Sequence, residues 1–298
     1  MTQNRYEFTL IGGDRRLCEL ASLLQAYGQD VNICHSGCDK QISGVKYCKS
    51  FEKSIFDCDI LVLPMPISKD KVHIFIKDND VAVSIKDVLE CAKRGNVKYI
   101  FGGNLCSEIH DIAHKVGVEI IDYSMSEEFL QDNAYATAEG GIMMAMENID
   151  TTLRSCNVLV SGSGRIANHL VNLLLPIGAN VTVCARNTEF LDKAEALGCH
   201  AVKISDTEKF REAVSDSMII FNTVPHRIFR KEHIENNNRS TYIELASCPG
   251  GIDLVSARIA GMKVIFAPSL PGRYCPVSAG EYIFRSINQI LKDRGIFS

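Results

Sequence analysis

Residues 157–178 read NVLVSGSGRIANHLVNLLLPIG, in which an apolar run passes through a glycine-rich turn into a helical pattern. The turn, residues 162–167, has the form G-x-G-x-x-A between a predicted strand and a predicted helix. In such a turn Gly162 permits the tight bend, Gly164 lets the backbone approach a pyrophosphate, and Ala167 allows close packing of the helix on the sheet. The stretch therefore predicts a dinucleotide-binding unit whose helix N-terminus holds the phosphates.

The whole second half of the chain repeats this strand-and-helix rhythm. Glycine, asparagine and proline stand at the switches between apolar runs and helical stretches, which favours a parallel sheet covered on both faces. Six strand-like runs are present, at 157–162, 180–186, 199–204, 218–225, 241–247 and 263–268. Six strands in this arrangement are typical of a doubly wound dinucleotide-binding domain.

The first half shows the same alternation with weaker signals. Its predicted strands are 8–13, 31–37, 59–66, 98–103 and 118–123, and its clearest predicted helix is 81–95. A connecting helix is expected to begin at Thr137 and run to about Ile149, and an amphipathic helix at 278–298 is expected to pack back on the first half.

We therefore predict an α/β protein with two Rossmann-like, doubly wound parallel-sheet domains and a cleft between them. Residues 1–148 form the predicted substrate domain, and residues 149–277 the predicted NADP-binding domain.

Composition excludes several classes of function. The 298 residues are 46% hydrophobic and 23% charged, a balance typical of a folded soluble protein, and the net charge of −4 makes nucleic acid and anionic membranes poor candidates for partners. Neither a secretory signal nor a membrane-spanning run is apparent, so we expect a cytoplasmic protein whose 12 cysteines are free thiols. The cluster at 34–38, CHSGC, has two thiols without a matching second pair, and no metal site is predicted.

The end of the second strand of the dinucleotide domain predicts the choice of cofactor. Arg186 lies 19 residues beyond Ala167, where NAD-dependent enzymes place an acidic residue against the ribose hydroxyls. A cation there favours the 2′-phosphate of NADP over NAD, although an exposed arginine at a strand end would read the same way. The predicted cofactor-binding residues are Gly162, Ser163, Gly164, Arg165, Ile166, Ala185, Arg186, Asn187, Asn222, Thr223, Val224, Pro225 and Ala246.

Two segments rich in glycine and proline follow the last two strands, at 246–253 and 267–276. They lie at the sheet edge where ligands bind in open α/β folds. The second is expected to be a stiff loop, from which Arg273 clamps a carboxylate or simply faces solvent. Both segments therefore predict walls of a small-molecule site.

Candidate substrate and catalytic residues are sparser. Arg15 and Arg16 follow Gly12-Gly13-Asp14 at a predicted helix N-terminus, a plausible corner for binding an anion, and Gly103 marks another predicted wall. Glu139, at the start of the predicted connecting helix, and His226, beside the fourth-strand turn, are the candidates for moving a proton.

Several of these segments together resemble the A subunits of dipicolinate synthases from spore-forming bacteria. They run in the same order over nearly the whole chain: 11–16 (IGGDRR), 137–150 (TAEGGIMMAMENID), 158–167 (VLVSGSGRIA), 221–225 (FNTVP), 244–253 (ELASCPGGID) and 267–280 (APSLPGRYCPVSAG). More distantly, the nucleotide half is similar to 2-hydroxyacid, alanine and shikimate dehydrogenases. Ser269 and Val277-Ser278 depart from the family pattern, where a glycine and a lysine–threonine pair are expected.

The resemblance implies an activity. The family oxidises dihydrodipicolinate, from the lysine pathway, to pyridine-2,6-dicarboxylate with NADP(H), and works with a flavoprotein-like B subunit during sporulation. It implies a small dicarboxylate substrate, a homo-oligomer, and a place in the cytoplasm of the mother cell. Because the family's lysine is absent, Arg273 would have to take its role.

Two other interpretations stay open at this point. One is a different NAD(P)-dependent 2-hydroxyacid or imino-acid dehydrogenase on the same scaffold, although neither a histidine–acid nor a lysine–aspartate pair can be placed. The other is a non-catalytic nucleotide-binding subunit, because the sequence shows no obvious general base.

Overall fold

The computed structural model describes residues 5–38, 41–77, 81–235 and 237–297. Contacts between Cα atoms divide the chain into two compact units. The described residues of Met1–Asp132 and Cys275–Ser298 form unit 1, and Asn133–Tyr274 forms unit 2. The first boundary along the chain falls within helix α5 (Glu127–Met146), whereas the sequence analysis placed the division after residue 148.

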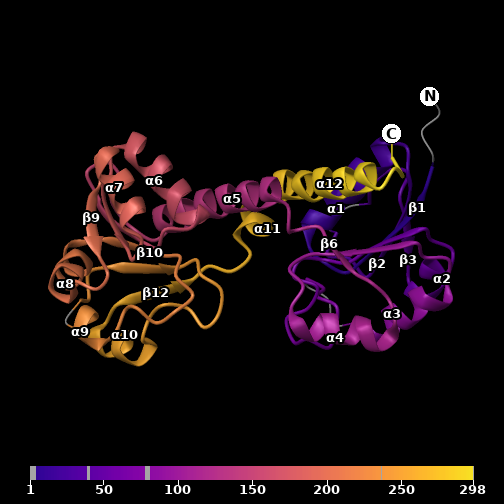
Figure 1. Cartoon of the computed structure of the whole chain (residues 1–298), viewed down its shortest axis with the longest axis horizontal. Coiled ribbons are helices and arrows are strands. Elements are labelled where there is room, and N and C mark those ends of the chain that lie inside the picture. The colour runs from indigo at the N-terminus through magenta and orange to yellow at the C-terminus, as the bar shows by residue number, and fades with distance from the viewer. Residues whose placement is uncertain (1–4, 39–40, 78–80, 236, 298) are drawn as a thin grey trace. The chain divides into compact units, whose positions relative to one another are not determined.

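Unit 1 is built on a six-stranded, fully parallel sheet (Figure 1). Its strands are β1 Glu7–Ile11, β2 Asp30–Cys34, β3 Lys46–Cys48, β4 Ile60–Val62, β5 Tyr99–Gly102 and β6 Ile121–Asp122. The order across the sheet is β3-β2-β1-β4-β5-β6, which is the order of a doubly wound dinucleotide fold.

Helices cover both faces of this sheet because successive strand residues point to opposite sides. Phe8 and Leu10 of β1 join the core under α1 (Arg15–Ala26) and α12 (Pro276–Asp293), while Ile11 joins the core on the other face. That second face carries α2 Phe51–Phe56, α3 Ile85–Arg94 and α4 Ser107–Val116. The C-terminal helix is thus part of the core of unit 1.

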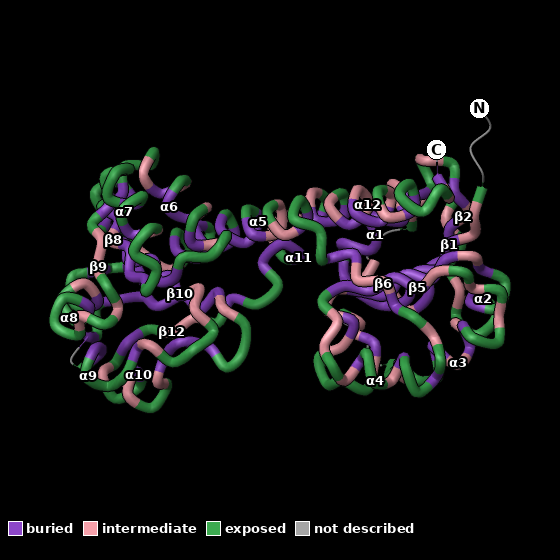
Figure 2. Tube along the Cα trace, in the orientation of Figure 1, coloured by how far each residue is buried: buried purple, intermediate pink, exposed green. Residues whose placement is uncertain are grey.

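Unit 2 has the same topology in a second parallel sheet. Its strands are β7 Asn157–Ser161, β8 Asn180–Ala185, β9 His200–Lys203, β10 Ile219–Asn222, β11 Thr241–Glu244 and β12 Lys263–Phe266, in the order β12-β11-β10-β7-β8-β9. Read from the other edge, this is again the doubly wound order. Figure 2 shows the four central strands largely buried and the outer turns of the helices exposed, whereas the edge strands β9 and β12 have no buried residue.

Two helical layers enclose the second sheet. On one face, Ala167, Leu170, Leu191 and Leu270 bring α6 Arg165–Ile177, α7 Thr188–Ala196 and α11 Leu270–Tyr274 into one core with α5 Glu127–Met146. The other face carries α8 Thr207–Asp216, α9 Lys231–Ile234 and α10 Leu254–Ala260. The predicted fold class, α/β with two Rossmann-like domains, is confirmed.

Several local predictions were wrong. The connecting helix begins at Glu127, ten residues before the predicted Thr137, so Glu139 lies in its middle and not at its start. The segment 267–276, predicted as a stiff loop, contains helix α11 and the first residue of α12, which places Arg273 on a helix. The edge strand β3 and helix α2 were not predicted.

The cysteines also differ from the expectation. Cys18 of α1 and Cys38 of the loop after β2 form a disulfide, so the prediction that all 12 cysteines are free thiols was wrong. Their spacing of 20 residues gives no sequence signal, because only the fold brings α1 beside that loop. Within the described part of the chain, no helix has both the length and the apolar character to span a membrane.

Candidate functional site

The turn between β7 and α6 uses its two glycines for different reasons. Gly162 has φ +109, and a Cβ there would lie 2.2 Å from Oγ1 of Thr223, so the fold itself requires glycine. Gly164 is the N-cap of α6 with φ −85, and a Cβ there would meet no atom within 4 Å. Its missing side chain therefore leaves open space in front of a helix N-terminus, as a bound diphosphate requires.

Ala167 is the last residue of the G-x-G-x-x-A motif and lies inside the protein. It is fully buried in the core between α6 and the sheet. A larger side chain there would hold the helix away from the strands, and the turn would lose its place at the strand end.

The predicted cofactor residues gather at the carboxyl ends of four strands of unit 2. Ser163, Gly164 and Arg165 are exposed at the turn after β7, and Ile166 is half-buried. Arg186 and Asn187 are exposed directly after buried Ala185 at the end of β8, and Asn187 caps α7 by accepting a hydrogen bond from the Phe190 N–H (3.1 Å). Because the strands are parallel, these residues share one edge of the sheet.

Two cations mark the end of β8. Arg186 follows the strand, and Lys203 of β9 stands opposite Ala185 in the parallel register. Both side chains are exposed. The position that an acidic residue takes in NAD-dependent enzymes thus has positive charge around it.

The carboxyl edge of this sheet also contains a network of buried polar side chains at the ends of β7, β10 and β11. The Ser161 hydroxyl at the end of β7 donates to Oδ1 of Asn222 at the end of β10 (2.6 Å). Asn222 Nδ2 in turn donates to the carboxylate of Glu244 at the end of β11 (2.6 Å). All three side chains are at most 3% exposed. The ends of three neighbouring strands are therefore joined by side chains as well as by the sheet.

Asn222 also holds the loop that follows it. Its Oδ1 accepts from the Val224 N–H (3.1 Å), and its Nδ2 donates to the Val224 carbonyl (2.9 Å). Thr223 donates from its hydroxyl to the Ser161 carbonyl (2.8 Å). The side chain of Asn222 is thereby engaged within the protein, while Pro225 is exposed and Thr223 and Val224 are half-buried at the edge.

Glu244 was missed by the sequence analysis. Its carboxylate accepts from Asn222, the Tyr242 hydroxyl (2.9 Å) and the backbone N–H groups of Ala246 (3.2 Å) and Gly251 (2.7 Å). Burial, together with the neighbouring Glu244, raises the pKa of Tyr242 above its ordinary value, so this phenol stays a donor. The one available signal was an acidic residue closing the apolar run TYIE.

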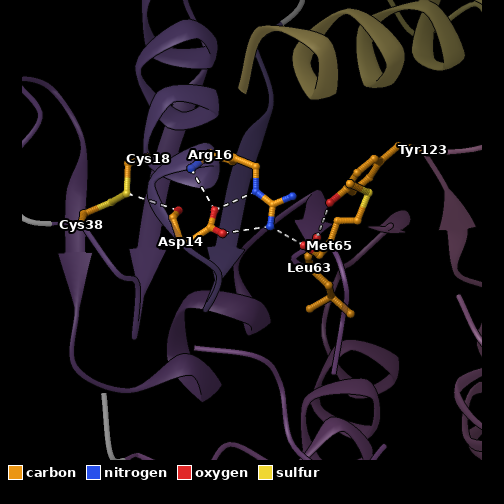
Figure 3. A network of polar contacts seen from close by, with 7 residues as sticks. All are labelled: Asp14, Arg16, Cys18, Cys38, Leu63, Met65 and Tyr123. Atoms are coloured by element: carbon orange, nitrogen blue, oxygen red, sulfur yellow. Dashed lines mark hydrogen bonds and ion pairs between the residues drawn. A yellow bond between two sulfur atoms is a disulfide. The ribbon is translucent and has the colours of Figure 1, made fainter. Parts of the chain in front are cut away.

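In unit 1, the helix N-terminus that was predicted to bind an anion already holds a carboxylate of the protein itself. Asp14 caps α1 by accepting from the Arg16 N–H (3.1 Å), and its carboxylate also pairs with the Arg16 guanidinium through Nε and Nη2 (2.8 Å each), as Figure 3 shows. Nη2 also donates to the Met65 carbonyl (2.5 Å). The carboxylate fills the place at the helix N-terminus that the sequence analysis left for a ligand.

The charge state of this pair follows from its surroundings. Burial opposes ionisation of Asp14, but the hydrogen bonds and positive charge of Arg16 outweigh it and hold the pKa of the carboxyl below its usual range. Arg16 is 5% exposed, whereas Arg15 projects from the surface. Only Arg15 of the two is presented to solvent.

The remaining candidates neither donate nor accept any of the hydrogen bonds described for these networks. Gly103 is buried, and a Cβ there would lie 2.7 Å from the Tyr123 ring, so its glycine serves packing. Arg273 is exposed on α11 with its guanidinium over the Tyr274 ring (4.9 Å). Glu139 lines an apolar hollow with Met143 and Leu173, and His226 is exposed after β10.

No group of three or more histidine, cysteine or acidic side chains suited to a metal ion occurs among the residues that the structure describes. The polar groups gathered at the carboxyl edge of unit 2 are hydrogen-bond donors, cations and one buried carboxylate. They suit a phosphorylated ligand.

Comparison with known proteins identifies relatives. Residues 7–124 match the family model of the N-terminal domain of the dipicolinate synthase A subunit. The A subunit of dipicolinate synthase from Bacillus subtilis (strain 168) is 27% identical over 290 residues, which cover 96% of each chain. The resemblance found from the sequence is thus confirmed.

Solved structures agree with these sequence matches. The A chain of dipicolinate synthase from Bacillus subtilis superposes with a TM-score of 0.80 at 25% identity, over 97% of this chain and 96% of that one. The corresponding A subunit from Bacillus halodurans gives 0.85 at 23% identity, over 96% and 97%. An L-alanine dehydrogenase shares the fold alone, with a TM-score of 0.64 at 15% identity over 96% and 91%.

Proposed function

We propose, from the premise that nearly the whole length of this chain is related to the A subunit of dipicolinate synthase, that it oxidises dihydrodipicolinate to dipicolinate with NADP+. The dihydropyridine loses a hydride and a proton and becomes an aromatic pyridine with both carboxylates unchanged. Aromatisation supplies most of the driving force, so the protein has mainly to hold and orient the two reactants.

The observation that carries this proposal is the open N-terminus of α6. The turn itself requires glycine at position 162. A Cβ at Gly164 would meet no atom within 4 Å, so the fold does not require glycine there. Helix N–H groups at this end would hold the diphosphate. A bound NADP+ supplies the hydride acceptor, and the residues after β7, β10 and β11 would hold it.

The preference for NADP over NAD rests on the end of β8. Arg186 and Lys203 would offer charge-assisted hydrogen bonds to a 2′-phosphate. The two carboxylates of the substrate would pair with exposed guanidinium groups, for which Arg15 and Arg273 remain the candidates. Arg16, whose guanidinium already binds Asp14, would act by holding the turn of unit 1 in place.

The proton released on aromatisation needs no strong base. His226 and Glu139 are both exposed and stay candidates for passing it to water. The proposal also includes a flavoprotein-like partner, the B subunit, together with a homo-oligomeric state and a role in sporulation in the cytoplasm of the mother cell.

Turnover tests the proposal directly. Purified protein is mixed with NADP+ and freshly generated dihydrodipicolinate, with and without the B subunit, and both reduced nicotinamide and dipicolinate are measured. We expect the two products in equal amounts. Formation of neither product under both conditions would leave at most a non-catalytic nucleotide-binding subunit.

A variant pair separates binding from folding. Gly164→Ala adds a methyl group into the space in front of α6 without touching the fold, so we expect unchanged thermal stability and a loss of affinity for NADPH. Asn172→Ala, exposed further along the same helix, should change neither. Equal affinity in the two variants would show that the turn does not hold the dinucleotide.

A further inference from the structure

The motif CPGG at 248–251 and the buried carboxylate of Glu244 have no part in the proposal above, yet the structure joins them. A Cβ at Gly250, where φ is +81, would lie 2.8 Å from Oε2 of Glu244, and a Cβ at Gly251 would lie 2.3 Å from Nδ2 of Asn222. The backbone of this loop therefore packs directly on the two side chains. Glycine is required at both positions because Asn222 and Glu244 occupy that space.

The hydrogen bonds fix the orientation of the network. The Val224 N–H donates to Oδ1 of Asn222, and the Val224 carbonyl accepts from Nδ2, so the amide cannot be reversed. Nδ2 must then donate to Glu244. The Ala246 and Gly251 N–H groups are donors as well, and the Tyr242 hydroxyl completes a set of four.

Four donors around one carboxyl group suit its ionised form, which only accepts hydrogen bonds. None of the four partners carries a positive charge. Burying such a charge costs free energy unless hydrogen bonds compensate for the lost hydration. Hydrogen bonds from neutral donors stabilise the carboxylate but do not cancel its negative charge. Glu244, at 3% exposure, thus places its carboxylate charge at the ligand-facing edge of the sheet.

We infer that Glu244 is a positioning residue that also makes the dinucleotide site favour the oxidised cofactor. Through Asn222 and Ser161 it fixes the spacing of the loops after β7, β10 and β11. The oxidised nicotinamide ring carries a positive charge that the reduced ring lacks. A buried carboxylate at this edge attracts the positively charged oxidised ring and has no such attraction for the uncharged reduced ring. This inference rests on the proposed function, since it presumes a nicotinamide cofactor in unit 2.

The test compares two dissociation constants in each variant. NADPH binding is followed by its fluorescence and NADP+ binding by competition, with thermal stability measured alongside. Glu244→Gln keeps the size of the side chain and removes its charge. We expect the affinity for NADP+ to fall about tenfold more than the affinity for NADPH, a difference equal to about 1.4 kcal/mol.

Controls separate charge from structure. Tyr242→Phe removes one hydrogen bond from Glu244 and leaves its charge, so both affinities should fall by the same factor. Glu212→Gln removes an exposed charge on α8 and should change neither. An equal loss of both affinities in Glu244→Gln would overturn the charge effect.

A second variant keeps the test decisive if Glu244→Gln does not fold. Asn222→Asp combined with Glu244→Gln returns one carboxylate to the network. One of its oxygens accepts from the Ser161 hydroxyl and the Val224 N–H, while the bond from position 222 to the Val224 carbonyl is lost. This double variant should recover the wild-type preference, and a lost preference in a folded double variant would refute the inference. Wild-type protein that binds neither dinucleotide would refute the proposed function instead.

Discussion

In the proposed function, the choice between the two nicotinamide cofactors depends on Arg186. It stands exposed after β8, where its guanidinium is accessible to a phosphate. We expect Arg186→Asp to weaken NADPH binding about tenfold or more and to strengthen NADH binding, because a hydrogen bond between charged groups contributes about 1.5–3 kcal/mol. Fluorescence titration with each cofactor measures both changes.

The matched control is Arg211→Asp, the same charge change at an exposed position of α8. It should leave the ratio of the two affinities unchanged. A variant at Arg186 that still prefers NADPH as strongly as the wild type would assign the preference to another group, and Lys203 would be the first to examine.

Asp14 makes the stability of unit 1 depend on pH. Its pKa in the folded protein is lowered from 3.8, so the folded state releases this proton more readily than the unfolded chain does. The resulting stabilisation is complete above about pH 3.8 and is lost as the pH falls through the folded pKa. We expect Asp14→Asn to be less stable than wild type at pH 7, with a difference that shrinks in acid.

Urea unfolding followed between pH 7 and pH 3 measures this difference in the free energy of unfolding. Asp57→Asn, at the exposed C-cap of α2, gives a reference for an ordinary surface carboxylate. A stability gap between wild type and Asp14→Asn that is the same at every pH would show that the Arg16 pair contributes through packing alone.

At the scale of elements, α12 depends on a close approach to α1. A Cβ at Gly280 would lie 2.6 Å from Cβ of Glu19 and 2.8 Å from the Arg16 carbonyl, and neither atom is the end of a flexible side chain. Gly280→Ala should therefore force the helices apart. Overpacking costs about 1–3 kcal/mol, against which alanine gains about 1 kcal/mol in helix propensity.

The expected net result is a lower thermal midpoint of unfolding for Gly280→Ala. Glu281→Ala, exposed at the next position of α12, receives the same side chain without the contact and should be close to wild type. If Gly280→Ala were the more stable of the two, propensity would outweigh packing and the two helices would have room to adjust.

Elements could be predicted where the signal was local. The apolar run, glycine turn and helical stripe at 157–178 stand in sequence order, so β7, the turn and α6 were all predicted. The start of α5 also had a local signal that was overlooked, because Ser126 accepts a hydrogen bond from the Phe129 N–H (3.2 Å) and two acidic residues follow it.

Other features depend on contacts that the sequence does not display. Proline and glycine in LPGRY indicated a loop, but Leu270 packs against Gly140 of α5, and this contact supports a short helix. Edge strand β3 has exposed residues and no apolar alternation. Glu244 becomes informative only when the parallel register brings Glu244 beside Asn222 of the neighbouring strand.

At the scale of the whole molecule, the chain contains one topology twice with opposite chemistry at corresponding turns. The Gly12 N–H donates to the Cys34 carbonyl in unit 1 (3.0 Å), just as the Gly162 N–H donates to the Cys184 carbonyl in unit 2 (2.8 Å). Two residues later the N-caps differ, with Asp14 in one unit and Gly164 in the other. A phosphate at α1 would meet a carboxylate, whereas one at α6 would meet helix N–H groups.

The chain's own backbone also covers the turn in unit 1. The Gly13 N–H donates to the Phe75 carbonyl (2.6 Å), and a Cβ on Gly12 would lie 2.7 Å from the same oxygen. This N–H is therefore committed within the protein before any ligand arrives. Shared topology alone would suggest two dinucleotide sites, but of the two turns only the one in unit 2 leaves its helix N-terminus open.

Calorimetric titration with NADPH should accordingly saturate at one dinucleotide per chain. The Gly164→Ala variant should bind none at the same concentrations, because the methyl group occupies the space in front of α6. Asp14→Asn should still bind one, since removing the negative charge does not free the Gly13 N–H from Phe75. Two dinucleotides per wild-type chain would mean that the turn of unit 1 accepts a phosphate despite its carboxylate. One dinucleotide retained in Gly164→Ala would mean that the turn of unit 2 does not hold it.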